Sequence, residues 1–282
     1  MKSKEHFSGE IVSDFHEPIE IQKRKVEQCV DQCREYISDN IKLADSETLE
    51  ILSKSLVYEP YLSINDISEI IDGESEYEGM MTVPVDAIIG SVSLAFKHWN
   101  DEYAGREGRI VEIAQELIEG TEESIDHVFH IQDHNQAIQL IRIFGPDGDI
   151  FIVVDGTHRV AGAKLVQLPE IPAVVEEVKE KKEYRTTDTF LVSQWKKRIA
   201  AGFIIGDIEE RIDSSGEKTY VFLIQEQIFS WAALPHDKLV EVNQVYSKVY
   251  PQALKEVKSL ITDEIIPENI LVDHFNLEMY LR

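Results

Sequence analysis

The sequence contains few cysteines and few basic residues, and it contains no long hydrophobic run. Its two cysteines, Cys29 and Cys33, are four positions apart with no histidine beside them. Such a pair makes a poor zinc site, so we expect half-buried thiols in a reducing cytoplasm. No apolar stretch approaches the roughly 20 residues that a membrane-spanning helix needs. Residues 1–15 have no apolar core, so we also expect no signal peptide and a cytoplasmic protein without membrane contact.

Basic residues are strongly outnumbered, with 28 Lys and Arg against 53 Asp and Glu and a net charge of −25 at pH 7. Repulsion of this size works against binding to a nucleic-acid backbone, so we do not expect nucleic acid as a partner. The charge fits a solubility device, an adaptation to salt or a surface for a basic protein partner. One stretch just past the middle of the chain is basic: Lys179, Lys181, Lys182, Arg185, Lys196, Lys197 and Arg198. Such a run is typical of a solvated helix face, although it would receive phosphates if it folded over a site.

The most informative part of the chain is a strand, a turn and a helix in immediate succession. Phe151–Val154 has the length and β-branching of a buried strand. The turn dipeptide Asp155-Gly156 ends it. Thr157, His158 and Arg159 then open a segment rich in Ala, Leu and Val, which we expect to be helical to about Leu168.

A hydroxyl, an imidazole and a guanidinium thus meet where a strand leads into a helix N-terminus. Unbonded amides and the positive dipole end favour an anion there, and an Arg fork can hold two phosphate oxygens. We therefore expect a phosphate site formed by Gly156, Thr157, His158 and Arg159. The same residues also fit a structural junction, in which Thr157 caps the helix and Arg159 pairs with a carboxylate.

This stretch resembles the signature of the ParB/sulfiredoxin fold, over about residues 80–178. There, a strand leads into a short motif ending in Arg, followed by a small-residue helix and a short strand. An opening strand, a helix and a strand pair precede the motif. The matching pieces here are Val83–Ile89, Glu107–Glu119, Ala137–Phe144 with Asp149–Val154, Asp155–Arg159, Ala161–Leu165 and Leu168–Val174.

Members of this fold differ at the motif. Sulfiredoxins have the similar motif Gly-Gly-Cys-His-Arg. Thr157 stands at the position of its Cys in this chain, which argues against thiol-based repair of sulfinic acids. Chromosome-partitioning ParB proteins have more Arg at this place and a DNA-binding helix-turn-helix behind it. The motif resembles most closely that of the free serine kinases, Asp-Gly-His-His-Arg, from which it differs at one residue. That resemblance implies that His158 and Arg159 bind nucleotide phosphates and that Asp155 assists Mg²⁺ or the acceptor hydroxyl.

The kinases of this fold place a Glu soon after the opening strand, and this sequence has none there. Asp86, Asp101 and Glu102 are the alternatives. We predict a nucleotide-binding protein, a kinase-like phosphotransferase or a nucleotide hydrolase, which uses ATP or another nucleotide, Mg²⁺ and a small-molecule acceptor. Asp155 and His158 are the expected catalytic residues, with Asp155 also the expected metal ligand. The alternatives are a non-catalytic nucleotide-sensing or protein-interaction module, and a ParB-like nuclease, against which the charge balance argues.

The pattern predicts an α+β chain in three parts. Residues 1–75 are expected to be helical, 76–183 to form the ParB/sulfiredoxin-like domain with a mixed sheet, and 184–282 to be mostly helical with a hairpin. Polar Gly73–Met80 is the expected linker. The expected flanking elements are helices Glu17–Lys42, Asp45–Val57, Asp188–Ile199, Asp237–Val249 and Gln252–Thr262, a short helix starting near Ser63–Asp66, and a hairpin of Glu209–Asp213 with Tyr220–Gln225.

Two further groups have alternative interpretations. On one helix, His127, His130 and His134 would share a face, as metal ligands do, although such histidines are more often surface or capping groups. One of them would then line the cleft next to the motif. Trp99 would stack on a nucleobase or, as Trp more often does, pack in a core.

Overall fold

The computed structural model describes residues 46–251 with short internal gaps, together with Ile21, Arg24, Gln28, Asp31 and Gln32. The gaps are 64–70, 94–95, 101–107, 131–135, 146, 181, 201–203, 213, 228–230 and 232. Several predicted features therefore lie wholly or mostly outside the described residues: helices Glu17–Lys42 and Gln252–Thr262, the short helix starting near Ser63–Asp66, Cys29, Cys33, Asp101, Glu102 and His134.

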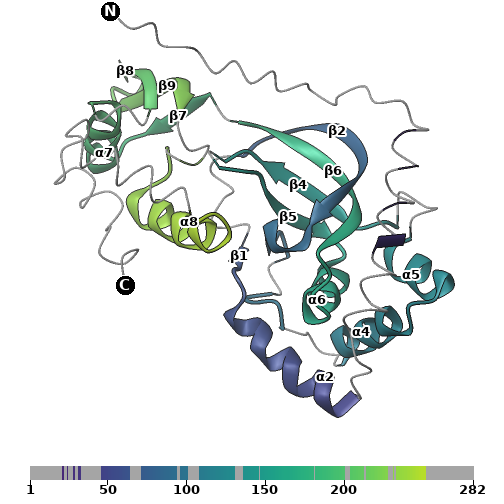
Figure 1. The fold of residues 1–282 in the computed structure, drawn as a ribbon. Helices are drawn as coiled ribbons and strands as arrows, with labels where there is room; N and C mark the ends of the chain where they lie inside the picture. The colour runs from purple at the N-terminus through teal and green to yellow at the C-terminus, as the bar shows by residue number, and fades with distance from the viewer. Residues whose placement is uncertain are drawn as a thin grey trace, which may run out of the picture.

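A central mixed sheet organises the described part of the chain (Figure 1). Its strand order is β1-β3-β5-β4-β6-β2. The strands are β1 (Leu62–Ser63), β2 (Ile71–Pro84), β3 (Ile88–Ser91), β4 (Gln139–Ile143), β5 (Ile150–Asp155) and β6 (Glu170–Glu180). β5 pairs antiparallel with β4 and parallel with β3, so it occupies the middle of the sheet. The predicted α+β class is confirmed.

The uninterrupted apolar run at the start of β5 follows from its central place. Phe151 and Val153 belong to a core on one face of the sheet, whereas Ile150 and Ile152 belong to a core on the other. Successive side chains of a strand point to opposite faces, so a strand covered on both sides has no polar face. The motif at the end of β5 is therefore fixed between two packed layers.

Helices α2 (Ser46–Ser53), α4 (Arg109–Glu119), α5 (Glu122–Phe129) and α6 (Thr157–Leu165) cover the first face (Figure 1). α4 and α6 pack closely because Gly162 has no side chain. A Cβ at Gly162 would lie 2.5 Å from Cγ2 of Ile113 on α4. This close approach sets the position of α4 relative to the motif helix.

Replacing Gly162 with Ala is expected to lower the free energy of unfolding by about 1–3 kcal/mol, because overpacking outweighs the gain in helix propensity. Urea unfolding of the parent and the variant measures this change. In an Ile113→Ala background the same substitution should cost less, since the clashing methyl group is gone. An unchanged or higher stability of the single variant would show that the helices separate freely.

The second face is covered by the C-terminal part of the described chain. It contains β7 (Glu183–Thr186), α7 (Thr189–Ala200), β8 (Ile204–Ile212), β9 (Lys218–Gln227) and α8 (His236–Val249), with sheet order β7-β9-β8. The Asp188 carboxylate accepts a hydrogen bond from the Phe190 amide at 2.8 Å, which confirms the predicted helix start. The predicted hairpin and the helix ending at Val249 are also confirmed. None of the described helices is long and apolar enough to span a membrane.

Two tyrosines of this C-terminal part hold the hairpin that carries the motif strand. The Tyr246 hydroxyl accepts from the Asp147 amide at 2.8 Å and donates to the Gly148 carbonyl at 3.2 Å. The Tyr250 hydroxyl donates to the Asp149 carbonyl at 2.6 Å. These bonds join α8 and its C-cap residue Tyr250 to the turn between β4 and β5.

The predicted linker Gly73–Met80 is wrong, because these residues lie within β2. β2 is the edge strand and pairs antiparallel with β6. An edge strand tolerates polar and Gly residues, which made the segment look like a linker. The expected boundary at 75/76 therefore falls inside β2, and that at 183/184 falls inside β7. The expected opening strand Val83–Ile89 is also interrupted, by a 3-10 turn at Val85–Ala87.

Candidate anion-binding pocket

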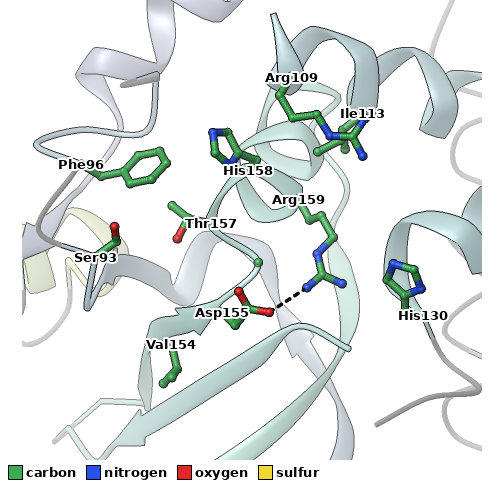
Figure 2. Close-up of a pocket in the computed structure, with 11 residues that line it drawn as sticks. Ser93, Phe96, Arg109, Ile113, His130, Val154, Asp155, Thr157, His158 and Arg159 are labelled. Atoms are coloured by element: carbon green, nitrogen blue, oxygen red, sulfur yellow. Dashed lines mark hydrogen bonds and ion pairs between the residues drawn. The ribbon is translucent and has the colours of Figure 1, made fainter. Parts of the chain in front are cut away.

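A pocket of about 370 Å³ lies where β5 leads into α6 (Figure 2). All five motif residues, Asp155–Arg159, line it, so the structure brings the predicted site residues together. The remaining lining residues are Val154 of β5 and five residues from three other segments: Ser93, Phe96, Arg109, Ile113 and His130. A volume of this size is within the range of small-molecule sites.

Gly156 shapes the entrance to α6. Its φ of +96° is a conformation that L side chains rarely adopt, and a Cβ there would lie 3.0 Å from Nη2 of Arg159. Gly156 is the N-cap of α6 and has no side chain to accept a bond from the first-turn amides. The positive end of the helix thus lies at the pocket without a side-chain cap from Gly156, an arrangement that favours an anion.

Arg159 has a structural task as well as a place in the pocket. Its Nη1 donates to the carbonyls of Gln136 at 2.6 Å and Val128 at 3.4 Å, and its Nη2 donates to that of Ala137 at 3.4 Å. Nη2 also lies 3.4 Å from Oδ2 of Asp155. Burial lowers the pKa of the Arg159 guanidinium, while Asp155 opposes the shift and the nearby Arg109 adds to it. Arg159 therefore joins the end of α5 and residues 136–137 to the motif.

Thr157 and His158 are held in place by neighbours outside the motif. The buried Ser91 and Thr157 hydroxyls are 2.9 Å apart, and the Ser93 amide donates to Oγ of Ser91 at 3.1 Å. The His158 ring packs edge-on against Phe96 with 5.1 Å between ring centroids. Thr157 is therefore a bonded residue of the pocket wall as well as a helix-start residue.

Arg109 and His130 bring further cationic or titratable groups to the pocket (Figure 2). Arg109 is the first residue of α4, and His130 follows α5 with a left-handed φ of 50°. The prediction that one histidine of the cluster lines the cleft is confirmed by His130. The shared helical face is wrong, since α5 ends at Phe129. No cluster of three or more His, Cys, Asp or Glu side chains suited to a metal occurs among the described residues.

Asp155 is the only carboxylate among the described residues that line the pocket. Its side chain is 65% exposed, so it is accessible to a ligand. Mg²⁺ is commonly held by one or two carboxylates together with substrate phosphates, and Asp155 fits that arrangement. Asp86, an alternative acid, is not among the lining residues.

The other sequence candidates do not contribute to the pocket. Trp99 is fully buried, and its Nε1 donates to the Pro60 carbonyl at 2.7 Å, so stacking on a nucleobase is wrong. In the basic run, Arg198 is buried and donates to the Leu234 carbonyl at 2.6 Å. No residue of that run is among the described residues that line the pocket.

Sequence reasoning missed Arg109, Ser91 and Phe96 as parts of the site. No local pattern marks them, because they reach the motif only through the packing of separate elements. Comparison with protein-family models, with curated proteins and with solved structures gave no match to this chain.

Proposed function

We propose that the pocket binds the phosphate groups of a nucleotide and that the protein is a phosphotransferase or nucleotide hydrolase. The observation that carries the proposal is the uncapped start of α6, which opens into a pocket also lined by Arg109 and Arg159. These positive groups gather in a chain with a net charge of −25. A local concentration of donors and positive charge of this kind favours an oxyanion.

The resemblance to the ParB/sulfiredoxin fold supports the same proposal. The order β5, motif, α6 and β6 is the order in that family's signature. The motif Asp-Gly-Thr-His-Arg is closest to the pattern of the free serine kinases. By that resemblance, His158 and Arg159 bind phosphate oxygens and the acceptor is a small molecule with a hydroxyl group.

Asp155 would hold Mg²⁺ together with the nucleotide, and the ion would neutralise phosphate charge. Arg159 can exchange its 3.4 Å contact with Asp155 for a shorter bond to a phosphate oxygen. Asp155 is then available to accept the proton of an acceptor hydroxyl or of water. If Thr157 Oγ1 accepts the hydrogen bond from Ser91, its own O–H would donate to the bound oxyanion.

A non-catalytic nucleotide sensor is the second candidate. It is favoured by the lining of the pocket, in which Asp155 is the one carboxylate among the described residues. An enzyme would need this one carboxylate as both metal ligand and base, whereas a sensor needs it for the metal alone. A nuclease is the third candidate, and the acidic charge opposes its approach to nucleic acid.

Thermal shift with ATP, ADP, CTP and GTP, with and without Mg²⁺, tests the binding proposal. Ligand that binds only the folded state raises the melting temperature. If none of these nucleotides raises it, the proposal is overturned. Assays of phosphate release and of phosphoryl transfer to hydroxyl compounds then distinguish an enzyme from a nucleotide sensor. A plasmid-nicking assay tests for nuclease activity.

Asp155→Asn is expected to lower turnover at least about 100-fold while ATP still binds, because the amide cannot accept the proton. Phosphate release at saturating ATP measures turnover, and calorimetric titration measures binding. Asp207→Asn, at an exposed position on β8, is the matched control and should leave both unchanged. Unchanged turnover in Asp155→Asn would show that this residue takes no part in the reaction.

A further inference from the structure

Two helices, not one, begin at the pocket. The first turn of α6 supplies Thr157, His158 and Arg159, and the first residue of α4 supplies Arg109. The start of α6 and the first residue of α4 therefore both lie at the pocket. The two guanidinium groups are near enough for Arg109 to act on the charge state of Arg159. Bringing like charges together is costly, and a polyanion between them offsets that cost.

Arg109 is only weakly held by its two ion-pair partners, Glu112 and Glu116. Its Nη1 lies 3.1 Å from Oε2 of Glu112 and 3.7 Å from Oε1 of Glu116, and its side chain is 40% exposed. Exposed ion pairs of this kind contribute little to stability, so the side chain can turn to a ligand at small cost. Neither glutamate is among the lining residues of the pocket.

Glu116 has a second partner that holds it outside the pocket. Its Oε2 lies 2.8 Å from Nδ1 of His127 on α5. When Arg109 turns toward a ligand, this bond keeps the glutamate on the α4–α5 side. Glu116 therefore does not accompany the guanidinium toward the ligand.

We propose that Arg109 binds the phosphate group farthest from α6, so that the pocket selects nucleotides by the number of their phosphates. The first phosphate occupies the α6 turn beside Arg159, and the terminal phosphate of a nucleoside triphosphate reaches α4. On this inference, a monophosphate occupies the α6 turn and leaves Arg109 without a phosphate partner. This inference rests on the proposed function, because it assumes that a nucleotide occupies the pocket.

The test is calorimetric titration of the full chain with AMP, ADP and ATP. We expect parent affinity to rise at least about tenfold from AMP to ATP. In Arg109→Gln, ATP affinity should fall about tenfold and AMP affinity should change by less than about twofold, since only the terminal contact is lost. Arg211→Gln removes the same charge from an exposed pair with Glu209 on β8 and should change neither affinity.

The outcomes separate this inference from the proposed function. Equal binding of AMP and ATP by the parent, or equal weakening of all three nucleotides by Arg109→Gln, overturns the role of Arg109 while nucleotide binding stands. An Arg109→Gln protein that binds ATP as tightly as the parent overturns it too. If the parent binds none of the three nucleotides, the proposed function itself fails.

Discussion

Arg159→Ala is expected to weaken ATP binding about 100-fold and to lower the free energy of unfolding by about 2–4 kcal/mol. The affinity loss follows from removing charge-assisted bonds to phosphate, each of which contributes about 1.5–3 kcal/mol. The stability loss follows from the carbonyls of Val128, Gln136 and Ala137, which lose their guanidinium donor. The sequence predicts the first effect only, since the carbonyl contacts arise from the tertiary structure.

Urea unfolding and calorimetric titration with ATP measure the two effects separately. Arg159→Lys keeps one positive charge but cannot bridge the three carbonyls, so it should recover part of the affinity and little of the stability. Arg211→Ala, at an exposed arginine, is the matched control and should cost under about 0.5 kcal/mol. Full ATP affinity in a folded Arg159→Ala protein would remove this residue from the site.

The parent protein is expected to gain about 3 kcal/mol of stability, relative to Lys164→Met, between pH 7 and pH 10.5. Lys164 is buried in α6 with only 7% of its surface exposed, its Nζ donates to the Val85 carbonyl at 2.9 Å, and it lies 5.1 Å from the centre of the Trp99 ring. Burial lowers the pKa of this amine from 10.5 to about 8, although Glu59 and Asp86 oppose the shift.

The direction of this change in stability follows from the number of protons that Lys164 binds in the folded and unfolded states. Below pH 8 the amine is charged in both states, so burial of the charge opposes folding in full. Between pH 8 and 10.5 the folded state releases its proton while the unfolded state keeps it, and stability therefore rises with pH. A shift of 2.5 pH units corresponds to about 3 kcal/mol.

Urea unfolding of the parent and Lys164→Met at pH 7, 8, 9, 10 and 10.5 measures this difference. Methionine keeps the length of the side chain and does not titrate, so effects of other groups cancel in the comparison. If the two proteins show parallel stability curves over this range, Lys164 keeps an ordinary pKa and its ammonium is solvated in the folded state.

Local signals predicted the core of the site. The apolar run of β5, the turn at Asp155-Gly156 and the small residues of α6 each determine their own conformation, and together they fix the motif. The capping carboxylate of Asp188 and the hairpin of β8 and β9 were predictable for the same reason. These features depend on neighbours in the sequence.

Features that depend on distant segments were not predictable in this way. The polar segment 73–80 becomes a strand only because β6 supplies its hydrogen-bond partners. Arg109 joins the pocket only because Gly162 lets α4 approach α6. The prediction that the histidines share a helical face is wrong because α5 ends before His130, which has a left-handed conformation.

A crystal structure of the full chain with Mg²⁺ and a non-hydrolysable ATP analogue tests the central claim most directly. The account predicts phosphate oxygens within hydrogen-bond distance of the first-turn amides of α6 and of Arg159, with the terminal phosphate next to Arg109. A nucleotide bound elsewhere on the protein, with this pocket vacant and the Arg159–Asp155 pair unchanged, would contradict it.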